Sequence, residues 1–315
     1  MNRPWNGYMQ LGIVHFMLYP QVIEGEGPIV ETARVIAEDD FFEVIEVGPI
    51  KDQRVWAELK GLIEGAHMSV GVGAQPGLLI NKLNLAAEGE TARQAAVDNV
   101  RGSIDQAYFL GARLLALLDG PGSYPGEERK AAAIDQLVRS LSELCAYAEG
   151  RGTDDLLTIS LENFDQSVDK RSLIGPTKDA AEVAARVKEE HTNFGLTVDL
   201  SHLPLLDETP QEALAAARDH LVHIHVGNCL MKDVNHPVYG DNHPPLGVEG
   251  GENDVQELVE FLEALFDIRY FTKELPTGRP VVTFEVKPLP DQDPAVVIAA
   301  TKRVWREAWA RLEVG

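Results

Sequence analysis

The segment HLVHIHVGNC, residues 220–229, decides how the rest of the chain is interpreted. It is a short apolar run in which His223 and His225 stand two positions apart. In a β-strand this spacing places both imidazoles on one face, while the aliphatic residues between and beside them take the other face. A strand that directs its aliphatic side chains outward and its histidines inward is expected in a barrel that carries a site at its mouth.

The chain on both sides of this segment alternates β-like runs with amphipathic helical stretches. The β-like runs are LGIVHFM (11–17), FFEVIEVG (41–48), HMSVGVG (67–73), ARLLALL (112–118), LLTISLE (156–162), FGLTVDL (194–200), HLVHIHV (220–226) and PVVTFEVK (280–287). The helical stretches are near 29–38, 52–64, 88–110, 127–149, 177–191, 210–218, 253–267 and 294–312. Eight such units predict a parallel sheet closed as one (β/α)8 barrel over residues 1–315. A doubly wound open sheet would need a glycine-rich phosphate loop after its first strand, and LYPQVIEGEGP (18–28) contains no GxGxxG.

Composition and charge narrow the range of functions. The chain has 315 residues, of which 44% are hydrophobic and 25% charged, as in an ordinary globular protein. Its net charge of −22 would repel the phosphate backbone, which argues against a nucleic-acid ligand. No run approaches the roughly 18–20 apolar residues of a membrane span, and MNRPWNGYMQ at the amino terminus lacks a signal peptide's apolar core. We therefore expect a cytoplasmic protein, in which Cys145 and Cys229 are small buried residues rather than a disulfide.

The last four predicted strands each end in a residue that can bind a metal ion or move a proton. These residues are Glu162, Asp199, His225 and Glu285. In a (β/α)8 barrel the carboxyl ends of the strands form the active site. Three carboxylates and one imidazole suit one divalent ion, Mn²⁺ first, with Mg²⁺, Co²⁺ or Zn²⁺ as alternatives. Such an ion could hold adjacent oxygens of a polyol or ketose, with Glu162 and Glu285 serving both as ligands and as the acid/base pair.

Each of these residues could instead have a purely structural role. Taken singly, Glu162 or Glu285 would more often be a capping or salt-bridging carboxylate, and Asp199 could cap the turn that follows it. His223 is better explained as a hydrogen-bonded residue of the barrel interior, about 6–7 Å below His225. The coincidence of four suitable strand ends nevertheless favours the metal site.

Four motifs at these strand ends resemble the xylose isomerase-like TIM-barrel superfamily. They are LEN (161–163), DLSH (199–202), HIHVGN (223–228) and FEVKP (284–288). Within this superfamily the chain is similar, over almost its whole length, to the sugar phosphate isomerase/epimerase branch, which includes ketose 3-epimerases. The resemblance implies four metal ligands, namely Glu162, Asp199, His225 and Glu285. It also implies that Glu162 and Glu285 exchange a proton on opposite faces of a keto sugar, and that His202 assists catalysis by contacting the substrate or the ligands.

The sequence departs from the ketose 3-epimerases near the predicted site. Glu162 is followed by Asn163 rather than by proline, and no arginine stands shortly after Gly227. These departures argue against simple ketohexose epimerisation. The loop 227–252 is long and rich in glycine, proline and histidine, and we expect it to lie over the active-site face.

Further residues are candidates for binding the substrate. They are His15 and Glu46 on the first two strands, Lys287 just beyond Glu285, and His243 in the loop. His236 and Asp241 of the same loop are also candidates. For each of these residues a turn-forming or structural role is at least as compatible with the sequence.

Several classes of function fit this site. A metal-dependent isomerase or epimerase would form an enediolate from a keto sugar and return the proton. A lyase or dehydratase would form the same intermediate but expel a leaving group from a 3-keto sugar or keto-glycoside. A repair endonuclease is disfavoured by the net charge and by the absence of a glutamate after Leu117-Leu118. A non-catalytic sugar-binding module is the remaining alternative. The expected partner is a small carbohydrate, and a homo-oligomer or a small partner subunit is compatible with the sequence.

Overall fold

Eight parallel strands form a closed barrel in the computed structural model, which describes residues 4–151 and 155–313. The strands are β1 (Gln10–Val14), β2 (Val44–Val47), β3 (Ser69–Gly73), β4 (Leu114–Leu117), β5 (Thr158–Glu162), β6 (Phe194–Asp199), β7 (Leu221–Gly227) and β8 (Val281–Glu285). They follow one another around the barrel in sequence order, and β8 pairs with β1 to close it. The predicted (β/α)8 barrel is therefore confirmed.

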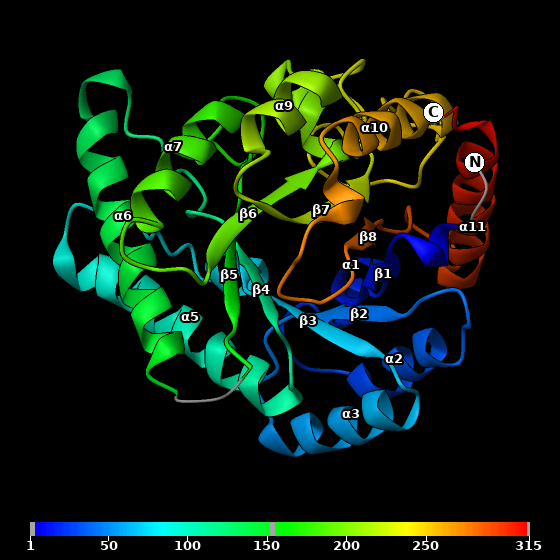
Figure 1. Ribbon diagram of the computed structural model, residues 1–315, viewed down its shortest axis with the longest axis horizontal. Helices are drawn as coiled ribbons and strands as arrows, with labels where there is room; N and C mark the ends of the chain where they lie inside the picture. Colours follow the sequence, from blue (N-terminus) through cyan, green and yellow to red (C-terminus); the bar gives the residue numbers. More distant parts are fainter. Residues whose placement is uncertain (1–3, 152–154, 314–315) are drawn as a thin grey trace.

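The helices surround the barrel as an outer layer (Figure 1). The α-helices are α1 (His15–Leu18), α2 (Ile29–Ala37), α3 (Gln53–Gly65), α4 (Gln75–Ile80), α5 (Glu90–Leu110), α6 (Glu127–Glu149), α7 (Thr177–Val187), α8 (Leu203–Leu206), α9 (Pro210–Ala217), α10 (Val255–Asp267) and α11 (Pro294–Arg311). Short 3-10 turns are η1 (Trp5–Gly7), η2 (Pro20–Val22), η3 (Leu200–His202) and η4 (Tyr270–Thr272). Capping boxes start α9 at Thr209 and α10 at Asp254, where each cap side chain accepts a backbone N–H that has no partner within the helix.

The first strand is shorter than the sequence predicted. The apolar run 11–17 was expected to be one strand, but β1 ends at Val14 and His15 begins the helical turn α1. A short apolar run has the same hydrophobic pattern in a buried strand and in a buried helical turn, so hydrophobicity alone could not locate the end of β1. The correction matters for His15, which lies beyond the strand and whose Nε2 is 2.7 Å from Thr32 Oγ1 on α2.

Strand register brings the ends of the last strands to one level. Asp199 pairs with His225 between β6 and β7, and Gly227 pairs with Glu285 between β7 and β8. An irregularity in β7 lies below this level, because Leu196 pairs with Leu221 but Thr197 pairs with His223, so that one extra residue is inserted. Such bulges locally alter where a strand's side chains point and are common next to active sites.

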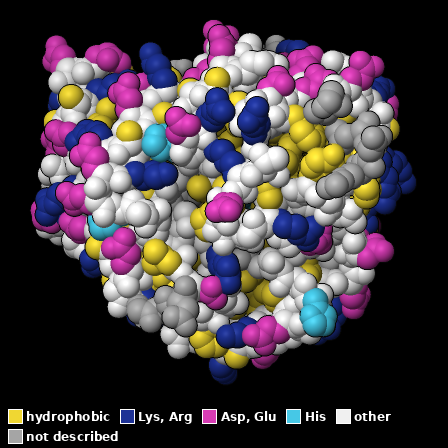
Figure 2. Space-filling model, viewed as in Figure 1, with side chains coloured by type: hydrophobic (Ala, Val, Ile, Leu, Met, Phe, Trp, Pro, Cys, Tyr) yellow, Lys and Arg dark blue, Asp and Glu magenta, His cyan; other side chains and the backbone are white. Residues whose placement is uncertain are grey.

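On the face shown in Figure 2, charged side chains are spread rather than gathered in one patch. Asp and Glu side chains alternate with Lys and Arg over the face shown in Figure 2. Cys145 and Cys229 are both buried, and each is a free thiol. In the described part of the chain, no helix combines the length and apolar character needed to cross a membrane.

Candidate metal site at the carboxyl ends of the strands

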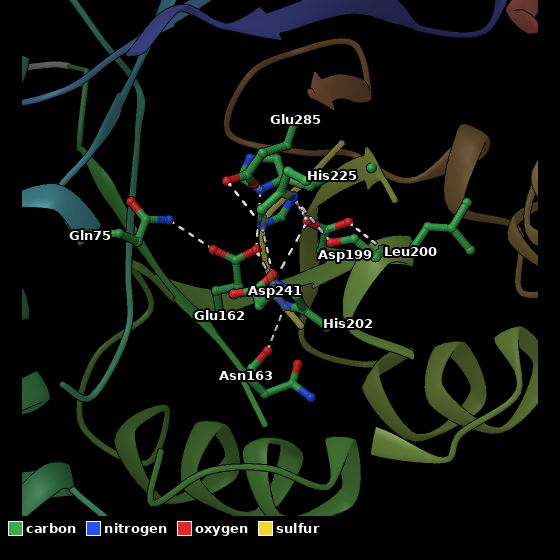
Figure 3. A network of polar contacts seen from close by, with 12 residues as sticks. Gln75, Glu162, Asn163, Asp199, Leu200, His202, His225, Asp241 and Glu285 are labelled. Atoms are coloured by element: carbon green, nitrogen blue, oxygen red, sulfur yellow. Dashed lines mark hydrogen bonds and ion pairs between the residues drawn. The ribbon is translucent and has the colours of Figure 1, made fainter. Parts of the chain in front are cut away.

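The four strand-end residues singled out from the sequence converge on one point. Donor atoms of Glu162, Asp199, His225 and Glu285 all lie within 4.8 Å of one another. The first three side chains are buried, and Glu285 is partly exposed. Figure 3 shows the three carboxylates arranged around the imidazole of His225. The arrangement follows from strand parity and register, since each residue occupies or adjoins the carboxyl end of its strand.

Contacts within this quartet leave acceptor capacity for a cation. The Nδ1 atom of His225 lies 2.8 Å from Glu285 Oε2 and 3.2 Å from Glu162 Oε1. Asp199 accepts the Ser201 backbone N–H at 2.7 Å through Oδ1, as a capping role would require. Its Oδ2 is buried and has no hydrogen-bond partner among the described residues. A buried carboxylate oxygen without a donor is costly, and a divalent ion bound by this donor set would satisfy it.

Electrostatics in the quartet are dominated by its negative charge. Burial alone would lower the pKa of His225, but the surrounding carboxylates, first that of Glu46, raise it well above 6.5. Burial alone would raise the pKa of Glu285, yet His243 and His225 lower it to about 2. Burial raises the pKa of Asp199. The quartet thus attracts positive charge strongly, and a metal ion and a proton on His225 would compete for the same place.

His202, predicted to assist catalysis, lies beside the quartet. Its Nδ1 is 2.9 Å from the backbone oxygen of Asn163, and its ring packs against Phe164 with centroids 4.3 Å apart. Its Nε2 is 3.3 Å from Asp241 Oδ1 and 3.9 Å from Asp199 Oδ2. Burial would lower the pKa of His202, but Asp241 and Asp199 raise it to about 10. These carboxylates therefore favour the protonated form of the His202 ring in the metal-free protein.

The long loop after β7 contributes two residues to the same cluster. His243 Nε2 lies 2.8 Å from Asp241 Oδ1 and 3.7 Å from Glu285 Oε1. Burial would lower the pKa of His243, but Glu285 and Asp241 raise it to about 9. The side chains of these two loop residues, His243 and Asp241, therefore lie next to Glu285 and His202.

Two residues near the site had not been identified from the sequence. Gln75, the first residue of α4, donates a hydrogen bond from Nε2 to Glu162 Oε2 at 2.8 Å. Lys170, in the loop after β5, forms an ion pair with Asp241 Oδ2 at 3.1 Å. Gln75 stands two positions after the end of β3, so its place at a strand end was the one signal that could have identified it. Lys170 follows its strand by eight residues and carries no comparable signal.

An open pocket of about 180 Å³ leads to this cluster. Its polar lining residues include Gln75, Lys170, Asp241, His243, Glu285 and Lys287. Its apolar lining residues include Phe16, Met17, Ile23, Pro76, Leu79 and Phe164. Among the candidate substrate-binding residues, Lys287 and His243 line the pocket.

His15 and Glu46 do not line that pocket as far as the described residues define it. His15 is buried against α2, and burial lowers its pKa to about 4. Glu46 lies in the barrel interior, between the imidazoles of His223 and His225. His223 is itself fully buried, and its position deeper than His225 agrees with the layer predicted for it.

Residues 35–300 match the family model described as xylose isomerase-like TIM barrel. The chain belongs to this family. The resemblance inferred from the strand-end motifs is thereby confirmed. No curated protein sequence matches the chain.

Solved structures share the fold at low sequence identity. D-Psicose 3-epimerase from Clostridium cellulolyticum H10 is 18% identical, with a TM-score of 0.69 over 97% of this chain and 100% of that one. The 3-keto-D-glucoside 4-epimerase YcjR from E. coli is 17% identical, with a TM-score of 0.66 over 96% and 99%. A zinc-bound IOLI protein is 14% identical, with a TM-score of 0.72 over 98% and 100%. At these identities the likeness concerns the fold.

Proposed function

We propose that this protein is a divalent-metal-dependent isomerase or epimerase of keto sugars. The observation that carries the proposal is the convergence of Glu162, Asp199, His225 and Glu285, whose donor atoms lie within 4.8 Å of one another beside a pocket that Glu285 lines. Solved structures with the same fold include epimerases named for D-psicose and for a 3-keto-D-glucoside, which supports a keto sugar as substrate.

The quartet would hold the metal ion, with Mn²⁺ as the first choice because three of the four ligands are carboxylates. Asp199 is the clearest ligand, since its Oδ2 is buried without a donor among the described residues. When bound, a divalent ion supplies Lewis-acid stabilisation of the negative charge that develops on a substrate oxygen.

Proton transfer falls to Glu162 and Glu285. Their strands, β5 and β8, are separated around the barrel by β6 and β7, so the two carboxylates approach the centre from different sides. One can remove a proton beside the carbonyl while the other returns a proton to the opposite face, which inverts the carbon. Gln75 orients Glu162 by donating to its Oε2, and this leaves Oε1 directed toward the centre of the site.

His202, His243 and Lys287 are suited to binding the sugar. His202 and His243 lie beside the quartet, and their ring N–H groups can donate hydrogen bonds to substrate oxygens. Asp241 fixes both rings and is itself anchored by Lys170. Of the two lysines that line the pocket, Lys170 forms that ion pair and Lys287 does not, and the lack of a cluster of lysines and arginines among the described lining residues favours an unphosphorylated substrate.

The proposal is tested by proton exchange. The Mn²⁺-loaded protein is incubated in deuterated water with a panel of ketohexoses and 3-keto-glycosides, and the products are analysed by NMR and mass spectrometry. We expect one solvent deuterium at an inverted carbon, with the carbon skeleton and any aglycone retained. An unsaturated product or a released aglycone would instead identify a lyase, and a panel without any exchange would overturn the proposal. Glu162→Gln is the matched control and should remove the inverted product, because Glu285 alone can exchange a proton on one face but cannot complete the inversion.

A further inference from the structure

Glu46 makes a contact that none of the roles above requires. It stands on β2, three strands away from β7 around the closed barrel, yet its side chain reaches both histidines of β7. Glu46 Oε2 lies 3.0 Å from His225 Nε2, and Oε1 lies 2.7 Å from His223 Nε2. The two rings are nearly perpendicular, at 83°, with their centroids 4.8 Å apart. One carboxylate therefore holds both rings.

We propose that Glu46 is a positioning residue of the metal site, which fixes the ring of His225 so that Nδ1 faces the carboxylates of Glu162 and Glu285. This inference rests on the metal site of the proposed function. A neutral imidazole that donates Nε2–H to Glu46 has its lone pair on Nδ1. In this structure Nδ1 is the atom that faces Glu285 and Glu162. A carboxylate behind a metal-binding histidine typically fixes the tautomer and raises the basicity of the ligand.

Glu46 does not line the substrate pocket, so its location argues against a direct role in substrate binding. Glu46 and His223 line a second pocket, of about 410 Å³, together with Gln10, Ser69 and Val281. Those three residues begin β1, β3 and β8, so this pocket belongs to the amino-terminal mouth of the barrel. Glu46 thus approaches His225 from the side opposite to the substrate pocket.

The barrel wall is adapted to this reach across the interior. Glu46 pairs in register with Gly71 on β3, and a Cβ at Gly71 would lie 2.9 Å from Glu46 Cγ. That approach is closer than a side chain tolerates, so the glycine keeps the space through which Glu46 extends. Charge is matched as well: burial alone would raise the pKa of Glu46, but His223 and His225 hold it well below its usual range.

Two variants disturb this contact in different ways. Glu46→Gln keeps the size of the side chain but removes its charge. Its amide has one acceptor oxygen, so it cannot accept an Nε2–H hydrogen bond from each ring through a separate oxygen as the carboxylate does. Gly71→Ala leaves every polar group in place and displaces Glu46 by steric contact alone. Glu26→Gln is the matched control, because Glu26 is an exposed carboxylate paired with Lys51.

The experiment measures metal binding rather than turnover. The apo forms are titrated with Co²⁺ in competition with a chromophoric chelator, which yields the dissociation constant, the stoichiometry and the visible spectrum of the bound ion. We expect one ion per chain in the wild type. Affinity should fall about 10- to 100-fold in Glu46→Gln and less in Gly71→Ala, with an altered Co²⁺ spectrum and an unchanged control.

Each alternative result has a distinct meaning. Unchanged metal affinity and an unchanged Co²⁺ spectrum in Glu46→Gln would overturn this inference but leave the proposed function standing. A lower thermal stability of apo Glu46→Gln with no loss of metal affinity would have the same meaning. Two ions per chain, with the second lost in Glu46→Gln, would show that Glu46, His223 and His225 bind a metal themselves, and would also overturn it. A wild type that binds no divalent ion would instead overturn the proposed function.

Discussion

The two halves of the barrel serve the candidate site in different ways. Strands β5 to β8 each bring one residue of the quartet to their carboxyl ends. The first half brings no member of that quartet, but Gln75 after β3 contacts Glu162, and Glu46 on β2 contacts His225. One half thus holds the groups that would bind metal and move protons, and the other holds groups that orient them. This division predicts that equivalent changes in the two halves will differ in size.

Removal of the metal ion should have the largest effect on turnover, because the four ligands on β5 to β8 would serve chiefly to hold this ion. Exhaustive chelation should abolish turnover, and returning Mn²⁺ should restore it. Restored protein should also be more stable to unfolding, by about 2.7 kcal/mol when free ion is at 100 times its dissociation constant. Chelated protein that is as active as the Mn²⁺ form, with no ion detected by elemental analysis, would contradict this.

Metal affinity should also depend on pH in a definite direction. Without metal, His225 has a raised pKa and holds a proton at neutral pH, whereas a metal ligand must be unprotonated. Binding therefore releases this proton at pH values below the raised pKa. Affinity should rise with pH, by about tenfold per unit for each proton released. Isothermal titration calorimetry in buffers of different ionisation enthalpy counts the protons released. An affinity that does not change from pH 6 to 8 would show that metal binding does not displace a proton from His225.

Within the second half, Glu162→Gln and Glu285→Gln should each lower kcat by about 10²–10⁴-fold, the usual contribution of a general acid or base. Both changes keep the shape of the side chain, so circular dichroism and the unfolding temperature should show a folded barrel. Measuring kcat at saturating Mn²⁺ separates lost chemistry from weakened metal binding. Full activity in either variant would remove that glutamate from the mechanism.

The same division explains which parts of the site the sequence could predict. The quartet was predictable because strand parity and the barrel's geometry place strand-end residues such as Glu162 and Glu285 together. The end of β1 at Val14 was not, because an apolar run carries no signal for that boundary. The inserted residue of β7 and the role of Gly71 depend on contacts between strands. Such contacts cannot be read from periodicity.

Gln75 tests whether the first half only orients. Gln75→Leu removes the hydrogen bond to Glu162 while keeping a similar volume. A hydrogen bond to a charged group contributes about 1.5–3 kcal/mol, so kcat should fall by roughly 10- to 100-fold. Gln75→Glu is a useful companion, since a second carboxylate against Glu162 should be worse than leucine. A kcat unchanged in Gln75→Leu would mean that Glu162 is oriented by the metal ion and the barrel alone.

The smallest effect should come from the rim of the pocket, where the second half meets solvent. Lys287 lines the pocket just beyond β8. Among the described residues it forms no ion pair with the quartet or with Gln75, Glu46 or Asp241. A partly solvated charge contributes about 0.2–1 kcal/mol, so Lys287→Ala should raise KM up to about fivefold and leave kcat unchanged. Lys287→Met, which keeps the length of the stem, separates lost charge from lost packing. A hundredfold rise in KM confined to phosphorylated sugars would show that Lys287 binds a phosphate group, and that the substrate differs from the unphosphorylated keto sugar proposed here.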